Sequence, residues 1–154
     1  MKVVVCEKEL RLFRFLQKRC RGVKLFSLRE APRVCDILVA GEAYFPAARQ
    51  FFPISALFVG GEEVFRRMAA AQNGIPPFES LVFCGMKGHH TLLFSSLREQ
   101  SGLLCLQRSV VFRGEELPIG EYPVDIFREG SLYENLVCSF IRLCQGMCGC
   151  EKDL

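Results

Sequence analysis

The chain contains no tryptophan, only two histidines and no long apolar run. No stretch reaches the ~18 apolar residues that a membrane-spanning helix requires, so we expect no association with a membrane. The formal charge of +3 is small. Nucleic-acid-binding proteins usually concentrate many more lysines and arginines on one surface, so a nucleic-acid partner is not expected. The GxGxxG and P-loop patterns of phosphate-binding loops are also absent from the sequence.

The first eight residues are not typical of a signal peptide. Their apolar stretch is short, an acidic residue follows it at once, and no small-residue cleavage site is present. We therefore expect a cytoplasmic protein. The nine cysteines are an odd number, and reduced thiols are the default state in a reducing compartment. With 154 residues, the length favours a single domain with a sizeable core.

Short apolar runs are abundant, and segments with helical patterning separate most of them. The five runs are Val3–Cys6, Lys24–Leu28, Asp36–Ala40, Ala56–Gly60 and Leu81–Gly85. This rhythm predicts a three-layer α/β fold whose mainly parallel, five-stranded sheet has a flavodoxin- or Rossmann-like order. Helices are expected over 9–21 and 62–72. Residues 91–99 predict another helix, although their short apolar cluster also fits a strand.

The last third of the chain has a different pattern. We divide the predicted domain into core βα units (1–100), a hairpin extension (101–128), a C-terminal helix (131–145) and a tail (146–154). Alternation on both sides of Arg113-Gly114 predicts a β-hairpin or a mixed edge extension of the sheet, and Pro118 and Pro123 place the second arm at a sheet edge. Ser131 and Glu134 form a capping box that starts the final helix, and Gly146 is expected to end it.

Ligands of an open α/β sheet bind beyond the carboxyl ends of the parallel strands. The candidate catalytic residues at those ends are Glu42, Lys87, His89 and His90. Imidazole is the usual general acid and base near neutral pH. Cys84 is a nucleophile candidate, but it continues an apolar strand and is expected to be buried. Adjacent histidines point in different directions, which does not favour a shared metal site, and the loop also fits a solvated polar turn.

Glycines at the same strand ends are candidates for binding a cofactor, because a bare backbone lets amides approach an anion. These candidates are Gly60, Gly61, Gly85 and Gly88. Glu62 and Glu63 follow at once and would repel a phosphate, so a tight strand-to-helix turn is favoured at this position. The sequence identifies no cofactor.

Three cysteines near the C-terminus are weak candidates for binding a metal. Cys144, Cys148 and Cys150 have C-x3-C-x-C spacing, whereas structural zinc sites usually use paired CxxC motifs. We therefore predict no metal. Cys144 fits the core of the last helix, and the other two fit exposed thiols.

Two groups of residues are candidates for contact with a partner. One is a basic stripe on the first helix, which fits an acidic partner or a solvated helix face. The other is an aromatic connection, which fits a homodimer or protein interface or folds onto the core. The residues are Arg11, Arg14, Lys18 and Arg21 in the stripe, and Tyr44, Phe45, Phe51 and Phe52 in the connection.

The spacing of the first three expected strands is similar to that of response-regulator receiver domains. The resemblance implies acidic residues after the first strand and an aspartate at the end of the third, where this chain has Glu7 and Gly41-Glu42. Lys87 follows the fifth expected strand, but no proline comes after it. The likeness is one of architecture and carries no function, so we assign no family.

Because no catalytic constellation appears at the strand ends, we expect a small non-catalytic binding or regulatory module of unknown ligand. One alternative is an enzyme that binds a small molecule or a nucleotide at the carboxyl rim of the strands. The other is a homo-oligomeric interaction subunit that docks through residues 44–52.

Overall fold

The computed structural model describes residues 1–46, 52–70 and 75–149. These residues form an eight-stranded sheet, a separate two-stranded hairpin, three α-helices and a short 3-10 helix. The strands are β1 (Lys2–Cys6), β2 (Lys24–Ser27), β3 (Val34–Ala40), β4 (Ile54–Gly61), β5 (Phe78–Cys84), β6 (Leu92–Leu97), β7 (Ser101–Leu106), β8 (Val110–Phe112), β9 (Glu115–Leu117) and β10 (Gly120–Asp125). The helices are α1 (Arg11–Arg19), η1 (Leu28–Glu30), α2 (Glu62–Ala70) and α3 (Leu132–Gly149).

The large sheet is mixed and has the order β10-β7-β6-β5-β4-β3-β1-β2. Neighbours from β2 to β5 are parallel, and β6 joins β5 in parallel through one bridge between Cys84 and Leu92. The pairs β6–β7 and β7–β10 are antiparallel. The predicted α/β fold with a mainly parallel sheet is therefore confirmed. The sheet has eight strands instead of the expected five, because residues 92–125 extend it beyond β5.

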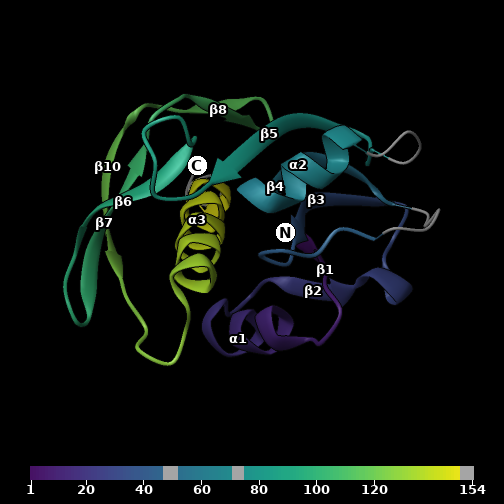
Figure 1. Cartoon of the computed structure of the whole chain (residues 1–154), viewed down its shortest axis with the longest axis horizontal. Helices are drawn as coiled ribbons and strands as arrows, with labels where there is room; N and C mark the ends of the chain where they lie inside the picture. Colours follow the sequence, from purple (N-terminus) through teal and green to yellow (C-terminus); the bar gives the residue numbers. More distant parts are fainter. Residues whose placement is uncertain (47–51, 71–74, 150–154) are drawn as a thin grey trace.

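The central strands are buried on both faces, as parallel sheets covered by helices require. Val3, Val4 and Val5 of β1 are almost inaccessible to solvent. Val3 and Val5 belong to the apolar cluster that includes α1 and α3, while Val4 belongs to the cluster that includes α2. The helices thus cover opposite faces of the sheet, α1 and α3 on one and α2 on the other (Figure 1).

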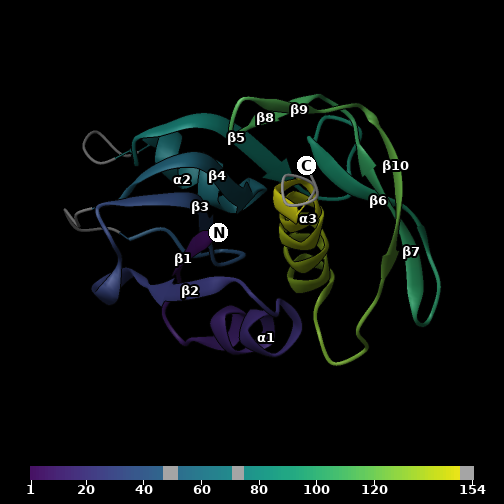
Figure 2. The ribbon, with the colours of Figure 1, turned by 180° about the vertical axis from the view of Figure 1, so that it is seen from behind.

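Helix α3 is the centre of the larger apolar cluster. In Figures 1 and 2 it lies between the half of the sheet formed by β1–β4 and the half formed by β6, β7 and β10. Phe140 and Ile141 of α3 are fully buried, and they share their cluster with Phe94 of β6 and Leu104 of β7. The antiparallel extension therefore completes the burial of α3.

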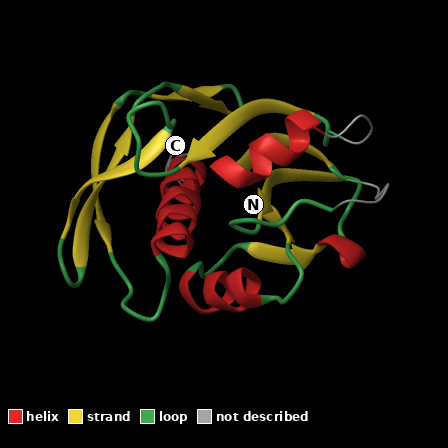
Figure 3. Cartoon of the chain, in the orientation of Figure 1, coloured by secondary structure: helices red, strands yellow, loops and turns green. Residues whose placement is uncertain are grey.

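The helix expected over residues 91–99 is wrong. Residues 92–97 are strand β6, drawn as an arrow in Figure 3, and they pair with β7, with Phe94 opposite Leu104. A short apolar cluster fits the periodicity of a helix as well as that of a strand, and the pairing with β7 makes this segment a strand. The boundary between 1–100 and 101–128 falls inside this β6–β7 hairpin. The single-domain organisation stays a prediction.

Two predicted helices also have different bounds in the structure. Helix α1 covers Arg11–Arg19 instead of 9–21, because Leu10 has a left-handed φ of 54°. Helix α3 continues past Gly146 to Gly149, so the predicted tail begins too early. Met147 and Cys148 pack against the core, and this packing offsets the cost of about 1 kcal/mol of a glycine inside a helix.

The predicted hairpin is confirmed. Strands β8 and β9 pair antiparallel around Arg113 and Gly114, whose φ angles are 52° and 80°. Two consecutive positive φ angles are typical of a type I′ turn. Strand β10 pairs only with β7 and forms one edge of the sheet. Pro123 therefore lies in an edge strand, as expected.

Candidate functional site

The loops that follow β3, β4 and β5 converge at one open cavity of about 470 Å³. Because these strands are parallel, their carboxyl ends lie at the same edge of the sheet. We call this space the rim cavity. It is lined by Glu42, Ala43, Gly61, Glu62, Glu63, Cys84, Gly85, Met86, Lys87, His90, Leu132, Tyr133 and Leu136. The structure thus brings the predicted residues Glu42, Lys87 and His90 to one cavity, with His89 beside it.

The two histidines lie against each other. Their ring centroids are 4.3 Å apart, and the His90 ring lies 4.6 Å from the ring of Phe83. His90 is only 2% exposed, whereas His89 is on the surface. The expectation that adjacent histidines point apart is therefore wrong here. The tight turn from Lys87 to His90, closed by a 3.0 Å backbone hydrogen bond, brings the rings together.

The buried His90 ring is held on one side only. Its Nδ1 lies 3.0 Å from both the amide nitrogen and the carbonyl oxygen of Lys87. Its Nε2 is buried and has no hydrogen-bond partner. A buried polar group without a partner costs about 1–3 kcal/mol. The nearest acidic atom is Oε2 of Glu62 at 3.9 Å, which is too far for a hydrogen bond.

Glu62 is the first residue of α2 and faces the loop after β5. The Lys87 ammonium lies 3.5 Å from its Oε2, and this charge is the main reason why the pKa of Glu62 is lowered. Burial acts in the opposite direction and is outweighed. Glu62 was not among the predicted catalytic residues. Its position directly after a strand end was the signal that it belongs to the site.

The first turn of α3 forms an apolar wall of the rim cavity. The sequence analysis did not place α3 at this rim, because no local pattern says which edge of a sheet a helix will reach. Tyr133 is buried, and its hydroxyl donates a 2.6 Å hydrogen bond to the carbonyl of Ala40. Leu132 and Leu136 extend the wall. The cavity thus combines this apolar side with the charged side from Glu42, Glu62 and Lys87.

Packing explains two of the four candidate glycines. A Cβ on Gly60 would meet Phe65 and Val64 at 3.4 Å, and a Cβ on Gly61 would lie 3.1 Å from the Glu42 carbonyl. A Cβ on Gly85 would lie 2.3 Å from Nε2 of His90, while Gly88 has open space around it. Gly61 and Gly85 therefore allow close contacts within the protein, while a Cβ on Gly60 would make only ordinary van der Waals contact. The role of these glycines in binding a cofactor stays a prediction.

Cys84 lies beside the rim cavity but is buried, and burial strongly raises the pKa of its thiol. A nucleophilic cysteine needs a lowered pKa and access to solvent. Cys84 has neither property. The candidate nucleophile of the sequence analysis therefore remains a protonated core residue at neutral pH.

Among the described residues, Cys144 and Cys148 do not form a group with a third metal-ligating side chain. Cys144 is fully buried in α3, where burial raises its pKa, and Cys148 is half-buried one turn later. Cys150 lies outside the described residues. Within residues 1–46, 52–70 and 75–149, the one group of three His, Cys, Asp or Glu side chains able to hold a metal is Glu62, His89 and His90.

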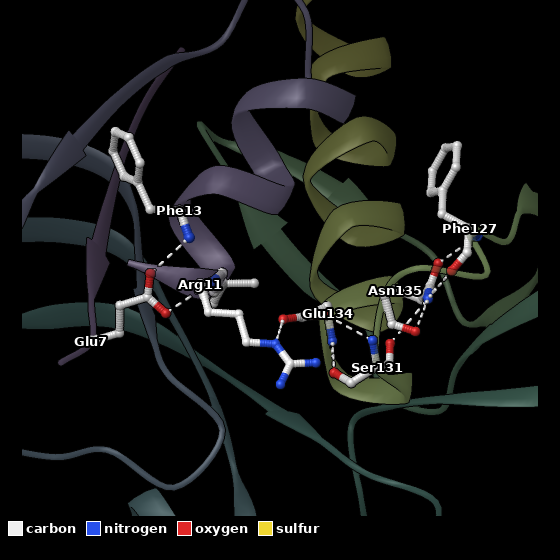
Figure 4. A network of polar contacts seen from close by, with 9 residues as sticks. Glu7, Arg11, Phe13, Phe127, Ser131, Glu134 and Asn135 are labelled. Atoms are coloured by element: carbon white, nitrogen blue, oxygen red, sulfur yellow. Dashed lines mark hydrogen bonds and ion pairs between the residues drawn. The ribbon is translucent and has the colours of Figure 1, made fainter. Parts of the chain in front are cut away.

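The basic stripe of α1 is partly used inside the protein. Arg11 donates a 2.8 Å hydrogen bond to the buried carboxylate of Glu134 (Figure 4). Glu134 also accepts from the Ser131 amide, and the Ser131 hydroxyl accepts from the Glu134 amide, which confirms the predicted capping box. Arg14, Lys18 and Arg21 are exposed, so they remain as surface cations.

Two further contacts in Figure 4 fix the starts of the helices. The Glu7 carboxylate accepts hydrogen bonds from the Leu12 and Phe13 amides and so caps α1. Asn135 exchanges hydrogen bonds with the backbone of Phe127 and holds the chain that enters α3. Glu7 follows a strand end, but it serves α1 and does not reach the rim cavity.

The aromatic connection folds onto the sheet as far as it is described. Phe45 is buried, and its ring stacks on that of Phe52 with centroids 6.0 Å apart. Tyr44 is half-buried at the edge of the same apolar cluster. Phe51 lies outside the described residues. The described aromatic rings are thus mainly core residues.

A second cavity of about 470 Å³ lies between β10 and α3. Its charged groups are Asp125 and Arg142, which form an ion pair of 3.1 Å with each other. The rim cavity is the stronger candidate for a ligand, because the ends of three parallel strands converge on it. No helix among the described residues has the length and apolar character needed to cross a bilayer.

Comparisons of the chain with protein-family models, with curated proteins and with solved structures found no match.

Proposed function

We propose that this protein is a small binding module that holds its ligand in the rim cavity and catalyses no reaction of its own. The observation that carries the proposal is the convergence of three consecutive strand ends with the first turn of α3 around one open cavity. Concave sites with an apolar wall and a few polar groups are the usual places for small ligands. Strand ends of an α/β sheet are a preferred position for them.

The charges in the rim cavity limit the chemistry of its ligand. Three carboxylates, from Glu42, Glu62 and Glu63, line it together with the single ammonium of Lys87. Glu62 and Glu63 are also the first residues of α2, so they already compensate the positive end of its dipole. Arg66 and Arg67 also pair with Glu62 and Glu63, so the excess of negative charge at the cavity is small. This balance favours a neutral or cationic ligand whose apolar part packs against Tyr133 and Leu132, and it disfavours a nucleotide phosphate.

The enzyme alternative has less support. The thiol that lines the cavity, that of Cys84, stays protonated, and Lys87 is engaged with Glu62. Nucleophilic catalysis needs a side chain activated by a neighbouring base, and neither residue meets that requirement. Docking through residues 44–52 is also less favoured, because Phe45 is buried and unavailable to a partner.

Two finer points belong to the same proposal. The order β2-β1-β3-β4-β5 within the larger sheet supports a flavodoxin-like unit at its centre. We also infer a cytoplasmic location, where the thiol form of buried cysteines such as Cys6 and Cys35 persists.

A thermal-shift screen of neutral and cationic metabolites, in the presence of a metal chelator, tests the function. A ligand at roughly a hundredfold excess over its Kd stabilises by about 2.7 kcal/mol, or about 5–10 °C for a chain of this size. Ala43→Trp places an indole at the exposed mouth of the cavity and should abolish the shift. The matched variant Leu97→Trp, which alters an exposed residue at the end of β6, should retain the shift. A ligand whose shift survives Ala43→Trp would show that the cavity is not its site.

A further inference from the structure

We propose that Glu62, His89 and His90 bind a divalent transition-metal ion at the edge of the rim cavity. One ligand atom from each residue lies within 4.8 Å of the other two. Glu62 comes from the start of α2, and the histidines come from the loop after β5. The inference rests on the proposed function in that it uses the rim cavity as the binding place, and it adds an inorganic ligand.

His90 is held in the position that a metal ligand requires. Its ring contacts those of Phe83 and His89, with centroids 4.6 and 4.3 Å away. The His89 ring is stacked on it at an interplanar angle of 28°, so this exposed ring turns to direct a nitrogen at the same ion. Beneath the His90 ring, Gly85 leaves the space that any side chain would fill. Because packing fixes the ring before an ion arrives, little side-chain entropy is lost on binding.

The backbone of Lys87 permits the tautomer that metal binding needs. A histidine that binds through Nε2 usually donates its Nδ1 proton to a carbonyl or carboxylate. Nδ1 of His90 lies 3.0 Å from the Lys87 carbonyl oxygen, which can accept that proton. Nδ1 of His90 also lies 3.0 Å from the Lys87 amide, which donates a hydrogen bond to Nδ1 when the ring is in the other tautomer.

Nε2 of His90 then has a lone pair and no partner within the protein. It is a buried nitrogen without a hydrogen bond, and it lies 3.9 Å from Oε2 of Glu62. In a tetrahedral zinc site with bonds of 2.0–2.1 Å, neighbouring ligand atoms lie ~3.4 Å apart. The two atoms therefore need to approach by only a fraction of an ångström, which the partly exposed side chain of Glu62 can do. An ion would complete the coordination of a nitrogen that the protein leaves unsatisfied.

Lys87 takes the place of the cation in the metal-free protein. Its ammonium lies 3.5 Å from the same Oε2 of Glu62 and is 66% exposed, so it can move into solvent. A metal ion and this ammonium compete for one carboxylate. Removing the ammonium should therefore strengthen metal binding, a response that a purely structural Glu62–Lys87 pair would not show.

The donor set indicates which ions fit. Two imidazoles and one carboxylate suit zinc and its transition-metal neighbours, whereas magnesium and calcium prefer oxygen alone. Three protein ligands leave a fourth position, which faces the rim cavity and can take water or a ligand atom.

The experiment titrates chelator-treated, full-length protein with ZnCl₂ by calorimetry and with CoCl₂ by visible absorption. We expect one ion per chain, with the absorption bands of four-coordinate cobalt, and no heat with MgCl₂. Glu62→Gln and His89→Ala alter exposed or half-exposed groups and should each weaken binding by about tenfold or more. Lys87→Met should strengthen it, and Arg67→Met, which alters a cation that contacts Glu63 instead, should leave it unchanged.

Zinc held by thiols would overturn the proposal, and so would the absence of saturable binding below about 100 µM zinc. The double variant Cys148→Ser/Cys150→Ser separates the first case, because it should bind zinc as the parent does. His90→Ala is avoided, since removing a buried ring would disturb folding. The thermal-shift screen is done in chelator and is controlled by Ala43→Trp, so it tests ligand binding without a metal. A negative metal titration would therefore contradict the metal site and leave the test of the proposed function unaffected.

Discussion

The hydroxyl of Tyr133 donates a 2.6 Å hydrogen bond to the carbonyl of Ala40, 93 residues earlier in the chain. It joins the first turn of α3, which lines the rim cavity, to the end of β3. Burial is the main reason why the pKa of Tyr133 is raised well above its ordinary value. The hydroxyl therefore keeps its proton and remains a hydrogen-bond donor at neutral pH.

Tyr133→Phe should destabilise the protein by about 1–3 kcal/mol, because it leaves a buried carbonyl without its donor. Urea unfolding followed by circular dichroism measures the change. Tyr122→Phe is the matched control, since the Tyr122 hydroxyl donates to the carbonyl of Pro118 at the surface. Its loss should cost less than about 1 kcal/mol, because water replaces the donor. Equal losses in the two variants would contradict the role given to Tyr133.

Gly85→Ala should displace His90 from its position over the strand end. The added Cβ would lie 2.3 Å from Nε2 of His90, and such overpacking typically costs about 1–3 kcal/mol. Gly88→Ala, three residues later, meets nothing within 4 Å and should be nearly neutral. Thermal unfolding compares the two variants, and an undisturbed Gly85→Ala protein would show that the ring has other room.

The ion pair between Glu62 and Lys87 predicts a specific dependence of stability on pH. The pKa of Glu62 is lowered from its ordinary 4.5, mainly by Lys87. Its ionised form thus stabilises the folded state above that value, and this contribution is lost as the pH falls through the lowered pKa. Lys87→Met should make the acid-side decline in Tm shallower, while Arg67→Met should not. A parallel decline in the parent protein and Lys87→Met would refute the pairing.

Alkylation by iodoacetamide should separate the cysteines by burial. Burial is the main factor that raises the pKa of Cys6 and Cys35 to about 12, and it raises that of Cys84 as well. We expect these thiols to react only after unfolding, with the half-buried Cys105 and Cys148 modified first. Mass mapping of the labelled peptides reads out each site. Rapid labelling of Cys84 in the folded protein would instead favour the enzyme alternative.

Much of the parallel half of the fold could be predicted from sequence because its signals are local. Runs such as Val3–Cys6 are filled by β-branched residues that are buried on both faces of a parallel sheet. The Ser131–Glu134 capping box and the Arg113-Gly114 turn each depend on a few adjacent residues. The parallel strands also allowed the prediction that residues 42, 61 and 85 lie at one edge of the sheet.

The rest depended on contacts between distant residues. Leu92–Leu97 becomes a strand because it pairs with β7 and packs against α3, and neither partner is visible in its own pattern. The stacking of His89 on His90 depends on the turn that Lys87 closes. The place of Tyr133 in the rim cavity depends on the path of α3 across the sheet. Sequence periodicity carries none of this information.

Pro123 in β10 has a consequence for how copies of this chain meet. Strand β10 is the last strand on its side of the sheet, and a proline there has no amide hydrogen to offer to an added strand. On the opposite side, β2 is only four residues long and begins with a lysine. Both edge strands thus disfavour the addition of a strand from a neighbouring molecule, which opposes fibrous aggregation in crowded solution.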